Sequence, residues 1–418
     1  MTKSIFHSFV LITLACTACT GDIVDQAEPT ATESRDESAS PDSGSTAATS
    51  SADAGAPTAQ ALATAGKTEA VSAPVAADKT ASSRTAATTI PSSTTTQRPD
   101  YNHGQGFFVR DGKLYDANGN EFRIRGVNKV HWDAETAGLL NVRPSLTRWA
   151  VDFTQSSSAN LALLQGKAGN GGTIAEGSVV MPGNWNGTCK DDPALLTEIV
   201  DTWVAQASAW TQLEKYMILN IANEWGPGGG EQWRDSYIAA VKRLRDAGYH
   251  ATLSVTAPAC GQDPNAIVKY GQAIYDSDPE KNVIFDQHLY GEYQDARGGA
   301  PGKFDDMPDL EAHIAGLAKS GLVVILGEFG PGRDVGPSPT NINPQRVMKF
   351  AEQYGLGWLA WAWDDNNLAQ SLSDDNGFSM SIRGSYQTSA DLTEFGRQVV
   401  EDSVLGLKVL AKRASIFD

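Results

Sequence analysis

Short runs rich in aliphatic and β-branched residues alternate with longer stretches of helical periodicity over most of this chain, and this alternation limits the possible folds more than any other feature. Strands and helices that alternate in this way form a parallel sheet. About eight such units over roughly 300 residues predict an α/β fold, a (β/α)8 TIM barrel. The predicted strands are residues 123–128, 146–151, 177–181, 216–222, 251–256, 282–286, 322–327 and 357–362.

Between the predicted strands, apolar residues recur every three or four positions, as on one face of a helix. Residues 193–210, for example, carry Leu196, Ile199 and Trp203 at this spacing. The first two connections are the least regular, because 133–140 is short for a helix and 166–172 is rich in glycine. The remaining predicted helices are residues 232–247, 264–276, 309–320, 344–354 and 390–404.

The first 21 residues have the composition of an export signal: Lys3, an apolar stretch over residues 5–15, and then small residues. Cys16 and Cys19 each end a short sequence similar to the cleavage site of bacterial lipoproteins, so lipid anchoring and free secretion are both open. The apolar stretch is too short to span a bilayer. We therefore expect an exported bacterial protein, extracellular or on the outer surface, that touches a membrane only through a lipid anchor.

Residues 22–100 consist mostly of Ala, Ser, Thr, Pro and acidic residues without hydrophobic periodicity. Such a segment buries too little apolar surface to offset its conformational entropy, so we predict a disordered linker. The folded barrel domain is predicted to span residues 101–418. It begins with a β-hairpin, because residues 107–122 alternate apolar and polar side chains around the turn sequences Asp111-Gly112 and Asn118-Gly119.

The formal net charge of −17 argues against a nucleic acid or an anionic membrane as the partner, because both require a basic surface. The chain that follows the linker, roughly 320 residues, is long enough for one large core. Of the four cysteines, Cys189 and Cys260 lie in this part. An even number in an exported chain suggests one disulfide, and the alternative is two free thiols.

Two hydrophobic runs each lead to a glutamate: Glu224 follows the fourth predicted strand and Glu328 follows the seventh. Active groups of such barrels lie at the carboxyl ends of the strands. One strand-terminal glutamate is more often structural. The whole set at these ends is suited to sugar hydrolysis, since it combines two carboxylates with an arginine, histidines, amides and indoles. The other members are His131, Arg148, Asn184-Trp185-Asn186, Asn223, His288, Tyr290, Trp361 and Trp363.

From about residue 106 to the C-terminus, the chain resembles glycoside hydrolase family 5 of clan A, and most of all its bacterial endo-β-1,4-mannanases. A strand-four Asn-Glu combined with Gly-Glu-Phe-Gly on strand seven is specific for this family. The motifs that carry the resemblance are Arg125-Gly-Val-Asn128, Leu219-Asn-Ile-Ala-Asn-Glu-Trp225, Gln287-His-Leu-Tyr290, Gly327-Glu-Phe-Gly330 and Gly357-Trp-Leu-Ala-Trp-Ala-Trp363.

The resemblance implies a retaining double displacement on a β-1,4-linked polysaccharide. Glu328 would be the nucleophile and Glu224 the acid and base, with carboxyl groups about 5–5.5 Å apart. Arg148 and Tyr290 would hold Glu328 ionised, and the charge on Glu328 would help to keep Glu224 protonated.

The remaining roles follow from the same resemblance. Asn223 would bind the 2-hydroxyl of the sugar, His288 would line the cleft, and Trp363 would form the platform beneath the reacting sugar. His131 and Trp225 complete the supporting set. We expect no metal and no cofactor, and a monomer.

The chain departs from the mannanases at two places. They carry a histidine after strand three, whereas this chain has Gly183-Asn184-Trp185-Asn186, so that Asn184 could supply the missing hydrogen bond. Cys260 stands where the mannanases often have an aromatic residue, and a bridge to Cys189 would tie two loops across the cleft rim. An endo-β-1,4-glucanase is therefore the alternative, and a carbohydrate-binding surface lipoprotein without turnover is an alternative of another class.

Overall fold

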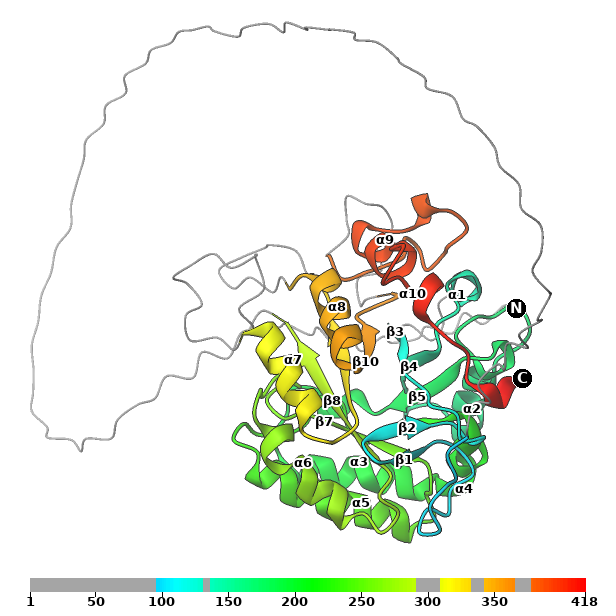
Figure 1. The fold of residues 1–418 in the computed structure, drawn as a ribbon. Coiled ribbons are helices and arrows are strands. Elements are labelled where there is room, and N and C mark those ends of the chain that lie inside the picture. The colour runs from blue at the N-terminus through cyan, green and yellow to red at the C-terminus, as the bar shows by residue number, and fades with distance from the viewer. Residues whose placement is uncertain (1–94, 131–135, 291–308, 332–341, 365–376) are drawn as a thin grey trace, which may run out of the picture. The chain divides into compact units, whose positions relative to one another are not determined.

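The computed structural model describes residues 95–130, 136–290, 309–331, 342–364 and 377–418. Eight parallel strands form a closed barrel in which β10 pairs with both β9 and β3, which confirms the predicted (β/α)8 fold (Figure 1). The strands are β3 (Arg125–Lys129), β4 (Leu146–Ala150), β5 (Val179–Gly183), β6 (Ile218–Asn220), β7 (Thr252–Thr256), β8 (Val283–Leu289), β9 (Val324–Phe329) and β10 (Gly357–Ala360).

Helices connect successive strands and lie outside the barrel, as Figure 1 shows for α3 to α8. The α-helices are α1 (Ala137–Val142), α2 (Ser157–Gln165), α3 (Pro193–Ala205), α4 (Ala207–Trp210), α5 (Glu231–Asp246), α6 (Ala266–Ser277), α7 (Leu310–Lys319), α8 (Pro344–Tyr354), α9 (Glu394–Glu401) and α10 (Leu407–Leu410). The 3₁₀ turns are η1 (Ile174–Glu176), η2 (Trp185–Gly187), η3 (Thr211–Tyr216), η4 (Ser389–Asp391) and η5 (Ser415–Phe417). Among the described residues, we find no helix that combines the length and the apolar character needed to cross a membrane.

The structure differs from the predicted elements in two connections. The expected single helix over 193–210 is interrupted at Gln206, where the backbone leaves helical geometry between α3 and α4. The second crossover helix is α2, which precedes the glycine-rich segment 166–172 and which the hydrophobic pattern does not predict because α2 is only weakly amphipathic. Its start is marked by Ser156, whose side chain accepts a hydrogen bond from the backbone N–H of Ala159.

A short antiparallel pair, β1 (Phe108–Arg110) and β2 (Lys113–Tyr115), precedes the barrel. Thr96 donates a backbone hydrogen bond of 2.8 Å to the Gly119 carbonyl, so described residues before 101 already contact the domain. The export signal at residues 1–21, with Cys16 and Cys19, and the linker as far as residue 94 lie outside the described residues. These assignments stay predictions.

The barrel interior changes character along its axis. Its apolar cluster at the amino ends of the strands includes Leu146, Ile218 and Ile284, and Phe107 beside the hairpin packs against it. Farther along the same strands, the inward-facing side chains become polar. Two positions after Leu146 comes Arg148, and two positions after Ile284 comes Asp286. A separate, larger apolar cluster fills the layer between strands and helices. The polar half of the interior therefore opens at the carboxyl ends of the strands.

Candidate active site

The two predicted catalytic glutamates lie close together at the carboxyl ends of the strands. Glu328 is on β9, and Glu224 is in the loop that follows β6. A carboxylate oxygen of each, together with a ring nitrogen of His288, lies within 4.8 Å of the others. This spacing fits the roughly 5–5.5 Å of retaining glycosidases and not the roughly 6.5–9.5 Å of inverting ones. The pair can therefore attack and protonate one glycosidic bond.

The backbone of Glu224 is itself unusual, with φ of +52° in the left-handed region. This conformation costs a residue with a Cβ atom about 1–2 kcal/mol. Such residues persist where surrounding contacts fix them, and they gather at functional sites. Glu224 therefore depends on neighbouring loops for its position.

Arg148, on β4, is completely buried and joins the acidic groups. Its Nη1 lies 3.3 Å from Glu328 Oε1 and 3.3 Å from Asp286 Oδ2. Its Nη2 donates a hydrogen bond to Asn223 Oδ1. A buried cation is stable only with such partners, so Arg148 fixes the positions of Asn223 and Glu328 relative to one another.

His288 is buried among three carboxylates. Its Nδ1 lies 2.8 Å from Glu224 Oε1 and 3.4 Å from Glu328 Oε2, and its Nε2 lies 3.5 Å from Asp286 Oδ2. Burial alone lowers the pKa of His288, but the charges of Glu328 and Asp286 and hydrogen bonds to Asp286 and Glu224 outweigh burial and raise this pKa to about 10. His288 is therefore an imidazolium at neutral pH.

The charges of this cluster nearly balance. Its members are Arg148, Glu224, Asp286, His288 and Glu328. Two cations face three carboxyl groups, and each buried charge therefore has at least one partner of opposite sign. Glu224 meets one cation of the cluster, His288, whereas Asp286 and Glu328 each meet two.

The pKa of Glu328 corrects one expectation. Burial, and to a smaller extent the nearby Glu224, raise this pKa to about 7, although His288, Arg148 and Tyr290 lower it. Tyr290 donates a hydrogen bond of 2.8 Å to Glu328 Oε2. Arg148 and Tyr290 thus act in the predicted direction, but the prediction omitted the larger effect of burial. Glu328 is ionised above about pH 7.

Two of the predicted site residues hold the loop that carries Glu224. Asn223 Nδ2 donates a hydrogen bond of 3.0 Å to Thr188 Oγ1. The indole of Trp225 is fully buried and donates a hydrogen bond of 2.9 Å to the Asp192 carbonyl. Trp225 is therefore a supporting residue. The predicted contact of Asn223 with a sugar hydroxyl stays a prediction.

Trp363 does not form the predicted platform. It is fully buried, its Nε1 donates to the Gly384 carbonyl at 3.2 Å, and it packs edge-on against Tyr386. β10 ends at Ala360, so the inward alternation of its side chains does not continue as far as Trp363. The half-buried indole at this end is Trp361, which is therefore the better candidate for a stacking surface.

Asn184 also differs from its expected role. Its side chain accepts a hydrogen bond of 3.0 Å from the Asn186 backbone and so begins the turn η2. Trp185 instead faces the site, with its ring 5.0 Å from that of Trp361 and 5.8 Å from the guanidinium carbon of Arg148. Of the predicted group 184–186, the aromatic ring of Trp185 is thus the one beside Arg148 and Trp361. His131 lies outside the described residues.

Asp286 was missing from the predicted set, although the sequence carries a signal for it. An acidic residue inside a hydrophobic strand must have partners, and Asp286 stands two positions before His288, on the same face of β8. Because the predicted strand ended at Asp286, the sequence analysis did not place Asp286 and His288 on the same strand face. Gly327 is required beside it, because a Cβ atom at 327 would collide with the Asp286 carboxylate.

Cys189 and Cys260 form a disulfide, with their Cα atoms 4.4 Å apart. The bridge joins the loop after β5 to the loop after β7. Cys189 Sγ lies 3.5 Å from Glu224 Oε2. The disulfide is therefore part of the wall around this carboxylate.

A metal ion is the other chemistry that the group of Glu224, His288 and Glu328 could serve. A metal ligand must be a neutral imidazole with a free lone pair. His288 is instead held as an imidazolium by the carboxylates around both ring nitrogens. The geometry therefore favours proton transfer, and the expectation of a metal-free site stays a prediction.

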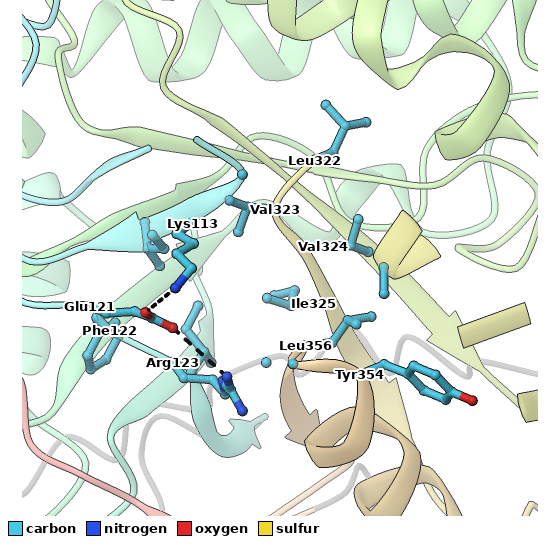
Figure 2. Close-up of a pocket in the computed structure, with 16 residues that line it drawn as sticks. Lys113, Glu121, Phe122, Arg123, Leu322, Val323, Val324, Ile325, Tyr354 and Leu356 are labelled. Carbon is cyan, nitrogen blue, oxygen red and sulfur yellow. Dashed lines mark hydrogen bonds and ion pairs between the residues drawn. The ribbon is translucent and has the colours of Figure 1, made fainter. Parts of the chain in front are cut away.

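A pocket also lies at the opposite end of the barrel, beside the hairpin. Figure 2 shows Lys113, Glu121 and Arg123 on one side, and apolar residues from the start of β9 and the end of α8 on the other. Glu121 pairs with Lys113 at 2.7 Å, and both side chains are about half exposed. Residues at this end of such barrels serve stability, and the catalytic charges are not among those that line the pocket.

The chain is similar to known carbohydrate-active proteins. A family model described as Cellulase (glycosyl hydrolase family 5) matches residues 181–367, which include both glutamates. A mannan endo-1,4-beta-mannosidase of Salipaludibacillus agaradhaerens is 31% identical over 327 residues, 75% of this chain and 96% of that protein. One from Streptomyces lividans is 28% identical and covers 75% of this chain and 78% of its own length.

Solved structures give the same picture. A beta-mannanase from Streptomyces thermolilacinus, crystallised with mannohexaose, superimposes with a TM-score of 0.62 and is 25% identical. The alignment covers 75% of this chain and 98% of that chain. The similarity thus includes nearly the whole of that chain.

Proposed function

Because the chain belongs to glycosyl hydrolase family 5, we propose that it hydrolyses β-1,4-linked mannan from within the polymer and retains the anomeric configuration. It is an O-glycosyl hydrolase. The observation that carries the proposed mechanism is the approach of the Glu224 and Glu328 carboxylates within 4.8 Å. The proposed substrate is supported by the mannosidase that aligns over 96% of its length.

In the first step, a Glu328 oxygen attacks the anomeric carbon while Glu224 gives its proton to the departing glycosidic oxygen. The C–O bond to the leaving sugar breaks, and an ester links Glu328 to the remaining sugar. Arg148, 3.3 Å from Glu328 Oε1, and Tyr290, 2.8 Å from Oε2, keep the attacking carboxylate oriented. Each contact restricts rotation of the nucleophile and so holds it in a reactive geometry.

In the second step, Glu224 accepts a proton from water, and the water oxygen attacks the anomeric carbon. The ester breaks, and Glu328 regains its negative charge. Glu224 is within 2.8 Å of His288 Nδ1, so the carboxylate formed after the first step faces a cation. This pairing stabilises Glu224 as the base that the second step needs.

The test is the release of reducing ends from galactomannan and from carboxymethylcellulose, measured side by side with the purified full-length protein. We expect galactomannan to be cleaved preferentially, with the β-anomer as the first product by proton NMR. The Glu328→Ala variant is the control and should release no sugar above background. Release of the α-anomer first would contradict the retaining mechanism.

One observation favours a second candidate, an endo-β-1,4-glucanase. Asn184 and Trp185 follow β5, where the mannanases carry a histidine, and Trp185 lies near Trp361. Sugar preference in such sites depends on the loops that line the subsites. Preferential cleavage of carboxymethylcellulose would support this candidate and overturn the proposed substrate. Binding of glycan by a parent protein without any turnover would instead support a carbohydrate-binding protein.

We also propose that the enzyme is exported and held on the cell surface through a lipid on Cys16 or Cys19. The composition of residues 1–21 supports export, and the two lipoprotein-like sequences support the anchor. The test is fractionation of cells that express the full chain or a C16A/C19A variant. The parent should sediment with membranes and the variant should not; a parent that appears in the medium would indicate free secretion.

A further inference from the structure

The disulfide lies beside the carboxyl group that must give and take the proton. Cys189 Sγ is 3.5 Å from Glu224 Oε2, and His288 Nδ1 is 2.8 Å from the other oxygen, Oε1. A disulfide sulfur carries no hydrogen, so its contact with Glu224 is one of packing. The Glu224 carboxyl group is thus held between a sulfur atom and an imidazolium.

The bridge connects two loops that both contact the backbone around Glu224. We call them the tethered loops: residues 184–192 after β5 and residues 257–265 after β7. From the first loop, the Lys190 carbonyl accepts a hydrogen bond of 2.9 Å from Gly226. From the second, Ala259 donates one of 2.8 Å to the Gly226 carbonyl. The residue two positions after Glu224 is therefore fixed from both sides.

Each tethered loop also contacts a second neighbour of Glu224. Thr188 Oγ1, next to Cys189, accepts a hydrogen bond of 3.0 Å from Asn223 Nδ2. Gly261, next to Cys260, accepts a hydrogen bond of 2.9 Å from the backbone of His288. The covalent link between the loops therefore couples the residue before Glu224 to the imidazolium that faces it.

Backbone conformation supports the same conclusion. Cys189, Glu224 and Cys260 all have left-handed φ values, of 52°, 52° and 55°. Residues with a Cβ atom avoid this region unless their surroundings impose it. A cross-link between the tethered loops removes the freedom by which all three could relax together.

We propose that the Cys189–Cys260 disulfide positions Glu224 for proton transfer to the leaving oxygen, a role that rests on the proposed retaining mechanism. The cysteines are positioning residues, because the carboxyl group of Glu224 performs the chemistry. Loss of the bridge should therefore impair protonation of the leaving group and should spare the attack by Glu328, which Arg148 and Tyr290 orient.

The experiment compares two leaving groups in the full-length C189A/C260A variant and its parent. A manno-oligosaccharide needs a proton on its departing oxygen, whereas 2,4-dinitrophenyl β-mannobioside releases a stable anion without one. The measured quantity is kcat/KM, which reports the first chemical step. We expect it to fall about 10- to 100-fold for the oligosaccharide and less than about twofold for the aryl mannoside, because small misplacement of a catalytic group is costly.

Equal losses on both substrates would overturn the proposal, since they would mean general damage to the site. No loss on either would also overturn it, since the bridge would then contribute only stability. Glu224→Ala is the matched control and should show the same selective loss in a larger form. Unchanged aryl mannoside turnover reports that the variant is folded.

If the variant does not fold, the parent treated with dithiothreitol replaces it, and reoxidation should restore oligosaccharide cleavage. The proposed substrate is tested separately by running aryl cellobioside and cello-oligosaccharide in parallel. A parent that cleaves only these would refute the mannan assignment, and the same pair of leaving groups would still decide the role of the disulfide.

Discussion

Ile284, Asp286 and His288 follow one another along the inner face of β8, yet they meet opposite environments. Ile284 belongs to the apolar floor of the barrel, which Phe107 also covers beside the hairpin. Asp286 and His288 lie at the mouth, where they share the charge network of Arg148. Within five residues, from Ile284 to His288, one strand thus passes from a region stabilised by apolar packing to one stabilised by ion pairs.

The difference has a physical consequence. Apolar packing at the floor is favourable by itself and tolerates modest changes in shape. Buried charges at the mouth are favourable only as a complete set, because a removed partner leaves another charge unpaired. We therefore expect substitutions at the mouth to affect activity and stability together, and substitutions at the floor to affect stability alone.

The largest effect is expected for Glu328→Ala, which removes the nucleophile. Activity should fall on the order of 10⁵-fold, as in other enzymes that lose a catalytic nucleophile. The measurement is reducing-end release from the preferred polysaccharide. Added azide should partly restore cleavage and yield an α-glycosyl azide, because a small anion can occupy the space of the carboxylate. Retention of normal activity would contradict the assignment of the active site to the carboxyl ends of the strands.

The next largest effect is expected for Arg148→Met. This change leaves Asp286 and Glu328 without the buried cation that lies 3.3 Å from each. The free energy of unfolding should fall by about 3–5 kcal/mol. Urea denaturation measures this loss, and the same preparation should lack activity. A variant as stable as the parent would show that the buried charges at the mouth tolerate the loss of a partner, as the apolar packing at the floor tolerates small changes.

The pH dependence follows from the pKa of Glu328, about 7. The attacking carboxylate must be ionised, so kcat/KM should fall about tenfold for each pH unit below about 7. Initial rates on the preferred oligosaccharide between pH 4 and pH 9 test this sign. An activity that rises as the pH falls through 7 would mean that the protonated form of Glu328 is the active one.

The floor should respond differently. Ile284→Val removes one buried methylene group from the apolar cluster, so the free energy of unfolding should fall by about 0.5–1.5 kcal/mol. kcat and KM should not change. Glu121→Ala, at the rim of the floor pocket, is the matched surface control and should change stability by less than about 0.5 kcal/mol, because its ion pair with Lys113 is about half exposed. A changed kcat in either variant would contradict the separation of the two ends.

The sequence alone was sufficient for the barrel and for its two glutamates. Runs of β-branched residues locate strands, and a glutamate at the end of such a run lies at the mouth by topology. Two cysteines after the linker suggested a bridge between Cys189 and Cys260 but left two free thiols open, and the structure contains the disulfide. α2 was not predictable by periodicity, because its apolar residues do not gather on one face.

Roles that depend on the end of a strand were harder to predict. Trp361 and Trp363 are two positions apart, so a strand that continued through them would place both on the same face. Because β10 ends at Ala360, Trp361 is half-buried at the site whereas Trp363 lies in the core. β8 extends to Leu289, past the predicted end at residue 286, and so places Asp286 and His288 on one face. The pKa of Glu328 depends on burial, which a list of neighbouring charges does not contain.

The charge network has a consequence for the energetics of turnover. When Glu328 forms its ester it loses a negative charge, and Glu224 gains one in the same step by giving up its proton. The total charge of the five side chains therefore stays constant from one half-reaction to the next. Arg148 lies 3.3 Å from Glu328, and His288 lies within 3.4 Å of both glutamates, so neither cation needs to move to follow the charge. The protein then has little dielectric reorganisation to perform during catalysis, and most of that work is completed when the chain folds.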